Sequence, residues 1–313
     1  MQASLPKRVT LIEVGPRDGL QNEQSPITTD VRIELCDRLT DAGFPNVEAG
    51  SFVSPKWVPQ MADTAELMQR IRRKPGVVYS VLTPNMKGFE GALAARADEV
   101  VIFGAASEAF SQRNINCSIA ESIERFEPVA RAAKDHGMRL RASVSVALGC
   151  PYQGEVTPAA VSEVVKRFAD MGSDMIDIAD TIGTGTPRGT QAAFEAALKV
   201  VPAERLSGHF HDTYGMALAN VYASLEMGIA TYHASVAGLG GCPYAKGATG
   251  NVATEDVLYL LHELGIKTGV DLNAVADTGR FILDQIGRKS GSRVGDAIIA
   301  KREPTIKPVP AKL

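Results

Sequence analysis

Cysteine is scarce and scattered in this 313-residue sequence. The four cysteines, Cys36, Cys117, Cys150 and Cys242, are far apart and form no CxxC pair. This spacing argues against a disulfide framework and against a structural zinc site, because both need cysteines in a recurring pattern. We expect the first three to be small core residues, whereas Cys242 stands in a glycine-rich segment described below.

Long apolar runs and an excess of positive charge are also missing. No run approaches the roughly 20 apolar residues that span a bilayer. Residues 1–8 lack the apolar core of a signal peptide and are too short for a typical transit peptide. The net charge of −3 gives no electrostatic reason to expect nucleic acid or an anionic membrane as a partner. We therefore expect a soluble, cytoplasmic protein.

A regular alternation of β-rich runs and amphipathic helical stretches fills most of the chain. Hydrophobic residues make up 45% of the sequence, enough to bury a sizeable core. Strands that alternate with helices pair in parallel, and eight such units over about 250 residues indicate a closed barrel. No GxGxxG follows the first strand, so an open dinucleotide-binding sheet lacks its fingerprint. The sequence therefore predicts an α/β fold, a (β/α)8 TIM barrel with additional C-terminal helices.

The expected elements form one domain that spans residues 1–313. The barrel covers about residues 9–265, a helical extension follows at about 271–303, and residues 304–313 form a loose tail. Strands are expected at Val9–Gly15, Asn46–Phe52, Val77–Thr83, Glu99–Gly104, Arg139–Leu148, Met175–Thr181, Leu206–Asp212 and Thr231–Leu239. Helices are expected at Thr29–Ala42, Ala62–Arg73, Lys87–Ala97, Ile119–His136, Pro158–Met171, Pro187–Val200, Ala217–Met227, Glu255–Leu264 and Leu272–Ile286.

Two histidines near the end of the seventh strand give the strongest chemical signal. His209 and His211 are two residues apart, so on a strand they share one face with Ser207, with side chains about 6–7 Å apart. The carboxyl ends of the strands are where TIM barrels carry their active sites. Two imidazoles at this spacing predict a site for a divalent transition metal or magnesium, completed by oxygen ligands.

The segment after the first strand offers a carboxylate and a guanidinium. Glycine–proline and aspartate–glycine pairs predict a tight loop around Arg17 and Asp18. Asp18 can give a hard oxygen ligand to the metal. Arg17 can bind a carbonyl or enolate oxygen. The alternative, a charged turn without function, has about the same weight from this segment alone.

The segment after the eighth strand is very rich in glycine. It runs through Gly238–Ala245 and on to Gly250, which is typical of a mobile lid. Cys242 near its tip could deliver a proton when the lid closes. Asn251 follows and could add an amide oxygen to the metal. A flexible loop with an incidental thiol is the competing interpretation.

Weaker polar signals stand at other strand ends. Glu48 belongs to the second strand, Asp180 ends the sixth, and residues 114–116, which include Asn114, follow the fourth. Together these residues place polar groups around one mouth of the barrel. A metal, an arginine and a proton donor are the parts needed to form an enolate and protonate it, so we expect metal-assisted chemistry next to a carbonyl.

Four long motifs carry a resemblance to a known family. Residues 14–23, 51–61, 209–215 and 238–245 resemble the corresponding segments of 3-hydroxy-3-methylglutaryl-CoA lyases, members of the DRE-TIM metallolyases. The similarity runs from about Val9 to Leu264. It implies an oxo-acid lyase of leucine degradation that cleaves a 3-hydroxyacyl-CoA by a retro-Claisen reaction to acetyl-CoA and a keto acid, which is acetoacetate for this family.

The resemblance also assigns roles to individual residues. It implies that Mg²⁺ or Mn²⁺ is bound by Asp18, His209, His211 and Asn251. It further implies that Arg17 stabilises the enolate of the departing acetyl-CoA and that Cys242 helps to protonate it. The remaining implied residues are Glu48 and Asp180 as supporting or acid–base groups, and Arg17, Gln21, Asn114, Ser143 and Asp177 as substrate contacts.

Three inward-facing positions depart from the family pattern. The family has Tyr, Ser and Asp where this chain has Ser143, Asp177 and His233. By strand alternation all three face the barrel interior, so these changes predict a reshaped pocket. The substrate could then be a citramalyl-CoA-like or longer 3-hydroxyacyl-CoA. An equally weighted alternative is that these substitutions compensate for one another and leave the substrate unchanged.

Two rival functions and the assembly stay open at this point. A synthase of the same group would form the carbon–carbon bond, although the Gly-Gly-Cys-Pro segment favours a lyase. A non-catalytic barrel that binds an acyl-CoA is the rival from another class. The family resemblance implies a homodimer with a small-molecule acyl-CoA substrate and with no organic cofactor beyond that CoA.

Overall fold

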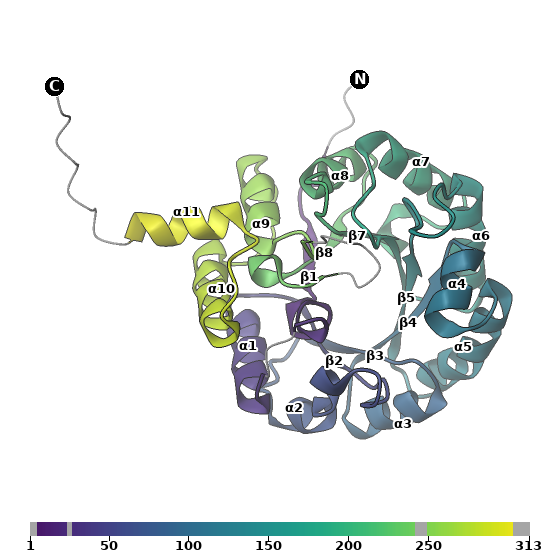
Figure 1. The fold of residues 1–313 in the computed structure, drawn as a ribbon, viewed down its shortest axis with the longest axis horizontal. Coiled ribbons are helices and arrows are strands. Elements are labelled where there is room, and N and C mark those ends of the chain that lie inside the picture. Colours follow the sequence, from purple (N-terminus) through teal and green to yellow (C-terminus); the bar gives the residue numbers. More distant parts are fainter. Residues whose placement is uncertain (1–4, 24–26, 242–248, 303–313) are drawn as a thin grey trace.

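The computed structural model describes residues 5–23, 27–241 and 249–302. Eight parallel strands form a closed barrel in sequence order, with β8 pairing back onto β1, which confirms the predicted TIM barrel (Figure 1). The strands are β1 (Thr10–Glu13), β2 (Asn46–Ser51), β3 (Val78–Leu82), β4 (Glu99–Ala105), β5 (Arg139–Ser145), β6 (Met175–Asp180), β7 (Leu206–Phe210) and β8 (Thr231–Ala234).

The helices form a ring outside the strands, as Figure 1 shows. Most begin at a side-chain cap, for example at Thr157 and Thr186, each followed by a proline that suits the first helical turn. The helices of this ring are α1 (Thr29–Asp41), α2 (Thr64–Arg70), α3 (Met86–Ala94), α5 (Ile119–Asp135), α6 (Pro158–Asp170), α7 (Pro187–Leu198), α8 (Ala217–Leu225) and α9 (Thr254–Glu263).

Alternation along the strands separates an apolar exterior from a polar interior. Ile176 and Ile178 of β6 are fully buried in the hydrophobic core beneath the helices. Asp177 between them faces inward and contacts Arg141 and His233. The interior of this barrel is therefore charged below its mouth, where a TIM barrel more often holds branched apolar side chains.

Several boundaries differ from the predicted ones. A helix, α4 (Glu108–Ile115), follows β4, where the sequence suggested a loop, and it contains Asn114. The predicted eighth strand ends early, at Ala234, because the chain turns into a 3₁₀ turn at Val236–Gly238 with Ala237 in the left-handed region. The first strand ends at Glu13 and continues into a five-residue π-helical turn, Gly15–Gly19.

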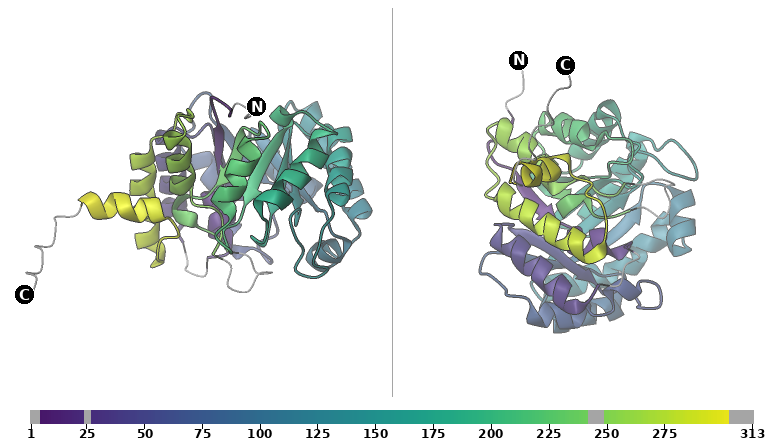
Figure 2. Two further views of the ribbon diagram at one scale, coloured as in Figure 1. Left: turned by 90° about the horizontal axis from the view of Figure 1, so that it is seen from above. Right: turned by 60° about the vertical axis from the view of Figure 1, so that its left-hand side comes forward.

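Two more helices follow α9, as predicted for the C-terminal extension. They are α10 (Leu272–Ile286) and α11 (Arg293–Arg302), and α10 lies against α1, α9 and the 3₁₀ turn after β8 (Figure 2). The extension therefore covers the outside of the barrel where its first and last strands meet. The predicted loose tail lies outside the described residues. In the part of the chain that the structure describes, no helix is long and apolar enough to cross a membrane.

Candidate metal centre and active site

The π-helical turn Gly15–Gly19 places Arg17 and Asp18 at the barrel mouth. The Glu13 carboxylate accepts hydrogen bonds from the amides of Gly15 (2.8 Å) and Val236 (2.9 Å), which joins the turn to the segment after β8. A side chain at Gly15 would place Cβ only 2.6 Å from Glu13 Oε1. The turn therefore needs glycine at this position for reasons of space.

Asp18, His209 and His211 form the predicted cluster. Asp18 Oδ2 lies 3.8 Å from Nε2 of His209 and 3.8 Å from Nε2 of His211. Ligand atoms about 2.1 Å from one octahedral ion lie about 3–4.2 Å apart, so this spacing suits a single ion. The Asn251 side-chain amide contacts Asp18 Oδ2 at 2.8 Å. The structure thus brings together the four residues predicted to bind the metal.

The ionisation of the cluster also suits a cation. Burial lowers the pKa of His209 to about 3 and lowers the pKa of His211, so both imidazoles are neutral near pH 7. Burial opposes ionisation of Asp18, but Arg17 and the two histidines hold its pKa well below the usual range. Within the described residues, the buried Nδ1 of His211 has no hydrogen-bond partner. A carboxylate, two neutral imidazoles and an amide make a suitable donor set for a divalent ion.

Three buried side chains stand behind His209 inside the barrel. His209 Nδ1 lies 3.1 Å from His233 Nδ1, and His233 Nε2 lies 3.4 Å from Asp177 Oδ1. Asp177 also accepts a hydrogen bond from Ser207 (2.6 Å). Asp177 and His233, two of the three positions expected to depart from the family pattern, therefore contact each other, and they lie behind His209, a predicted metal ligand. The predicted substrate contact through Asp177 stays a prediction.

Arg141 of β5 links this group to the rest of the barrel interior. Its guanidinium donates to Glu48 (2.6 Å), Glu99 (3.0 Å) and Asp177 (3.1 Å). Burial alone would raise the pKa of Glu48, but the charges of Arg17 and Arg141 lower it to about 2. The Arg17 side chain bonds Glu48 through Nε and Asp18 through Nη1 (2.7 Å). A buried ion network thus runs from the barrel floor to the metal centre.

Arg141 is not among the residues predicted from the sequence, although its position on the strand carried a signal. Arg141 stands two residues before Ser143 on the same strand, so both face the interior. Ser143 is partly exposed there. An arginine at such a position needs carboxylate partners, because a buried charge without them is very costly.

The other predicted site residues either lie farther from the Asp18–His209–His211 cluster or fall outside the described residues. Asp180 is buried, and its carboxylate accepts hydrogen bonds from the amides of Thr184 (3.1 Å) and Gly185 (2.9 Å). Asn114 is exposed on α4, and Gln21 is partly exposed after the π-helical turn. Cys242 lies outside the described residues.

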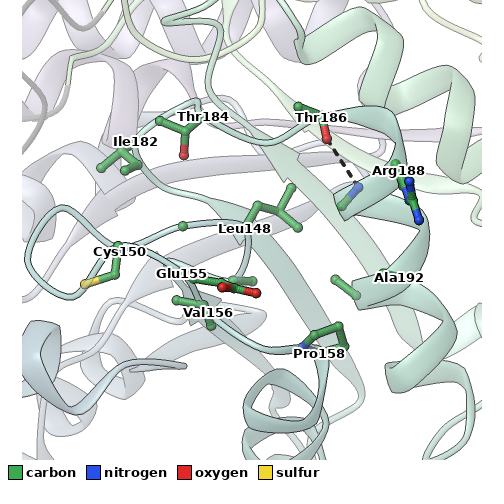
Figure 3. A pocket seen from close by; sticks show the side chains of 15 residues that line it. Leu148, Cys150, Glu155, Val156, Pro158, Ile182, Thr184, Thr186, Arg188 and Ala192 are labelled. Carbon is green, nitrogen blue, oxygen red and sulfur yellow. Dashed lines mark hydrogen bonds between the residues drawn. The ribbon is translucent and has the colours of Figure 1, made fainter.

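A separate pocket of about 620 Å³ opens between the loops that follow β5 and β6. Figure 3 shows Leu148, Ile182 and Val156 on its walls, with Arg188 at the start of α7. Among the described residues that line it, none is a member of the Asp18–His209–His211 cluster. Thr184 lines this pocket, and its amide also donates to the Asp180 carboxylate. The pocket is therefore next to the loop that Asp180 holds, but it is a different site from the Asp18–His209–His211 cluster.

Comparisons with known proteins identify the family of this chain. The family model described as HMGL-like matches residues 8–282. The chain belongs to the HMGL-like family. The family resemblance drawn from the four motifs is therefore confirmed.

Relatives in the HMGL-like family are similar over nearly their whole length. A 3-hydroxy-3-isohexenylglutaryl-CoA/hydroxy-methylglutaryl-CoA lyase of Pseudomonas aeruginosa is 58% identical over 95% of this chain and 99% of its own. The mitochondrial hydroxymethylglutaryl-CoA lyase of Gallus gallus is 55% identical over 94% of this chain and 99% of its own. A crystal structure of hydroxymethylglutaryl-CoA lyase from Pseudomonas aeruginosa superposes with a TM-score of 0.94, at 58% identity, over 95% of this chain and 99% of that one. These relatives confirm the predicted class of carbon–carbon lyases.

Proposed function

We propose that this chain cleaves hydroxymethylglutaryl-CoA to acetyl-CoA and acetoacetate in a metal-dependent retro-Claisen reaction. The observation that carries the proposal is the cluster of Asp18, His209 and His211 beside Arg17, in a chain whose relatives are hydroxymethylglutaryl-CoA lyases. The partner is accordingly a small acyl-CoA molecule. The ion is Mg²⁺ or Mn²⁺, which the nitrogen and oxygen donors of this cluster suit.

The residues divide the chemistry between them. When held by Asp18, His209, His211 and Asn251, a divalent ion supplies Lewis-acid polarisation of substrate oxygens. Arg17 stabilises the enolate oxygen that forms as the carbon–carbon bond breaks, and its bonds to Glu48 and Asp18 fix the guanidinium in advance. As that bond breaks, the 3-hydroxyl of the substrate gives up its proton to a base and becomes the keto group of acetoacetate. The thiol of Cys242 donates a proton to the enolate carbon, which gives acetyl-CoA, and proton transfer back to the thiolate restores the site.

Asp180 supports the site through the loop that it holds. Burial raises the pKa of its carboxyl to about 6, while the loop amides that it binds lower it. Its backbone carbonyl accepts a hydrogen bond from the amide of His211 (3.3 Å). We assign Asp180 a positioning role toward His211, with direct acid–base work as the alternative.

Turnover with and without metal tests the proposal. After treatment with a chelator, we expect hydroxymethylglutaryl-CoA cleavage to be lost and to return with Mg²⁺ or Mn²⁺. Cys242→Ser should lose most turnover and keep its affinity for Mn²⁺. If the parent chain binds acyl-CoA without cleaving it, the protein is the non-catalytic acyl-CoA-binding barrel named as the alternative above. If it condenses acetyl-CoA with a keto acid in preference, it is a synthase.

A longer substrate is a second candidate. Ser143 is a small, partly exposed residue inside the barrel, and the Pseudomonas aeruginosa relative is named for an isohexenyl as well as a methyl substrate. We expect the chain to cleave 3-hydroxyacyl-CoA esters that carry a larger group at C3, with kcat/KM compared across a series. Citramalyl-CoA, which is one carbon shorter than hydroxymethylglutaryl-CoA, is the other alternative ester in this series. Ser143→Tyr should lower kcat/KM for the larger ester more than for hydroxymethylglutaryl-CoA. An equal loss of kcat/KM for both esters would show that Ser143 does not line the acyl pocket.

The cellular setting also belongs to the proposal. We propose that residues 1–313 act as one domain, that the protein is a cytoplasmic homodimer, and that it serves leucine degradation. Support comes from α10, which packs on α1 and α9 of the barrel, and from the bacterial lyase at 58% identity.

A further inference from the structure

Arg288, which follows α10 in the C-terminal extension, joins segments that are distant in sequence. Its side chain is 26% exposed and forms an ion pair with Glu23. It also donates to the backbone carbonyls of Gly240 (3.1 Å), Gly238 (3.3 Å) and Thr249 (3.0 Å). One guanidinium therefore holds the loop after β1 and both ends of the segment that leads from β8 to α9.

These acceptors flank two of the residues that would hold the metal. Glu23 follows the turn that carries Asp18, and Thr249 stands two residues before Asn251. Asn251 Nδ2 contacts Leu239 O at 3.3 Å and Asp18 Oδ2 at 2.8 Å. In the sequence, Leu239 stands between Gly238 and Gly240, whose carbonyls both accept hydrogen bonds from Arg288.

The packing around this point leaves little room for the loops to shift. A Cβ at Gly240 would lie 2.7 Å from Asn251 Nδ2, and a Cβ at Gly250 would lie 2.7 Å from the Gly240 carbonyl oxygen. Both glycines have positive φ angles, 125° and 105°. The backbone at Gly240 therefore packs closely against the Asn251 side chain, which contacts Asp18.

Only an arginine side chain suits this set of acceptors. Its planar guanidinium has five N–H donors in a fixed fork, whereas a lysine has one compact ammonium group. Three carbonyl oxygens and one carboxylate oxygen around Arg288 use this fork. A lysine could keep the charge next to Glu23 but could not bind all four of these acceptors.

We infer that Arg288 is a positioning residue for the metal centre, one that fixes Asp18 and Asn251 relative to the two histidines. This inference rests on the proposed function, because that proposal places the divalent ion at this cluster, but Mn²⁺ binding can be measured whether or not the chain turns over a substrate. Outer partners of metal-binding groups typically change metal affinity or activity by about 10–100-fold when they are replaced. Arg288 acts through loop backbone and reaches the metal ligands indirectly.

The test measures Mn²⁺ affinity of the full chain without substrate, by electron paramagnetic resonance titration, and then kcat and KM. We expect Arg288→Ala to weaken Mn²⁺ binding by about 10–100-fold and to lower kcat. Arg288→Lys should recover only part of the loss, and Glu23→Gln should have a smaller effect. Arg302→Lys is the matched control, because Arg302 lies in the same extension and contacts Asp277 and Asn273 away from these loops.

Three results would overturn the inference. Unchanged Mn²⁺ affinity with a raised KM would make Arg288 a substrate contact. Unchanged affinity and kinetics with a lowered free energy of unfolding would make it a structural residue. Full recovery in Arg288→Lys would show that charge alone matters. If Arg288→Ala does not fold, Arg288→Lys and Glu23→Gln still decide, and the Mn²⁺ titration is valid even if the chain proves not to be a lyase.

Discussion

In the proposed metal centre, His209 and His211 come from β7 and its end, whereas Asp18 and Asn251 come from loops after β1 and β8. The strand side rests on fully buried side chains inside the barrel, with His233 and Asp177 behind His209. The loop side rests on backbone groups tied together by carboxylates and by Arg288. The difference suggests a rigid half that sets the position of the ion and a second half that depends on loop order.

The two halves also differ in how their charges are balanced. On the strand side, Arg141 has three buried carboxylate partners, and the charges of Arg17 and Arg141 lower the pKa of one of them, Glu48, to about 2. On the loop side, burial raises the pKa of Glu13 to about 7 and that of Glu255 to about 8, so both carboxyls hold protons at moderately low pH. Changes of pH near neutrality should therefore affect the loop half first.

Of the changes that test the difference between the two halves, removal of Arg141 should have the largest effect on the free energy of unfolding. Arg141→Met leaves Glu48, Glu99 and Asp177 buried without their shared cation. Breaking a buried ion pair from one side costs about 3–5 kcal/mol, and we expect at least that loss in the free energy of unfolding. Urea unfolding of the metal-free chain measures it.

Arg139→Met is the matched control on the same strand. Arg139 is half-exposed and pairs with Glu99 from outside the barrel end, at 3.3 Å. Exposed ion pairs contribute little, so we expect only a small change. Similar losses in both variants would contradict the view that the interior network supports the strand half.

Much of this architecture could be predicted from the sequence, and the reasons are local. Strand–helix alternation and the spacing of His209 and His211 operate over a few residues, so the barrel and the metal pair followed from them. The partners of Arg141 come from β2, β4 and β6, and no local pattern pairs it with Glu48 or Asp177. The helix α4 was not predicted because it is only eight residues long and mostly polar, and it ends at Ile115, just before Asn116 in a left-handed conformation.

An intermediate effect is expected from the pair behind His209. Asp177→Asn and His233→Leu should each weaken Mn²⁺ binding by about 10–100-fold, because they remove the group that orients the His209 ring. The double variant should lose less than the sum of the two, since the residues act in one chain of contacts. His262→Leu serves as the control, because it removes another histidine whose contact, with Thr268, does not involve His209. Additive losses would mean that the pair does not act through His209.

The last prediction concerns pH and the loop half. Both Glu255 oxygens accept from the Ala237 amide at 3.0 Å, and its folded pKa lies above the ordinary value. The folded chain therefore binds the proton more tightly, so this carboxyl stabilises the fold at low pH and loses that contribution as pH rises through about 8. The free energy of unfolding, wild type minus Glu255→Gln, should fall between about pH 5.5 and pH 8.5. A flat difference would show that Glu255 is ionised at all these values.

The metal centre itself is tested most directly by anomalous diffraction from crystals of this chain soaked in Mn²⁺. We predict one strong peak about 2.0–2.4 Å from Asp18 Oδ2 and from a ring nitrogen of both His209 and His211, with the Asn251 amide oxygen turned toward it. The peak should be absent in His211→Ala. A Mn²⁺ peak at another place, or one that persists at this place in His211→Ala, would contradict the account.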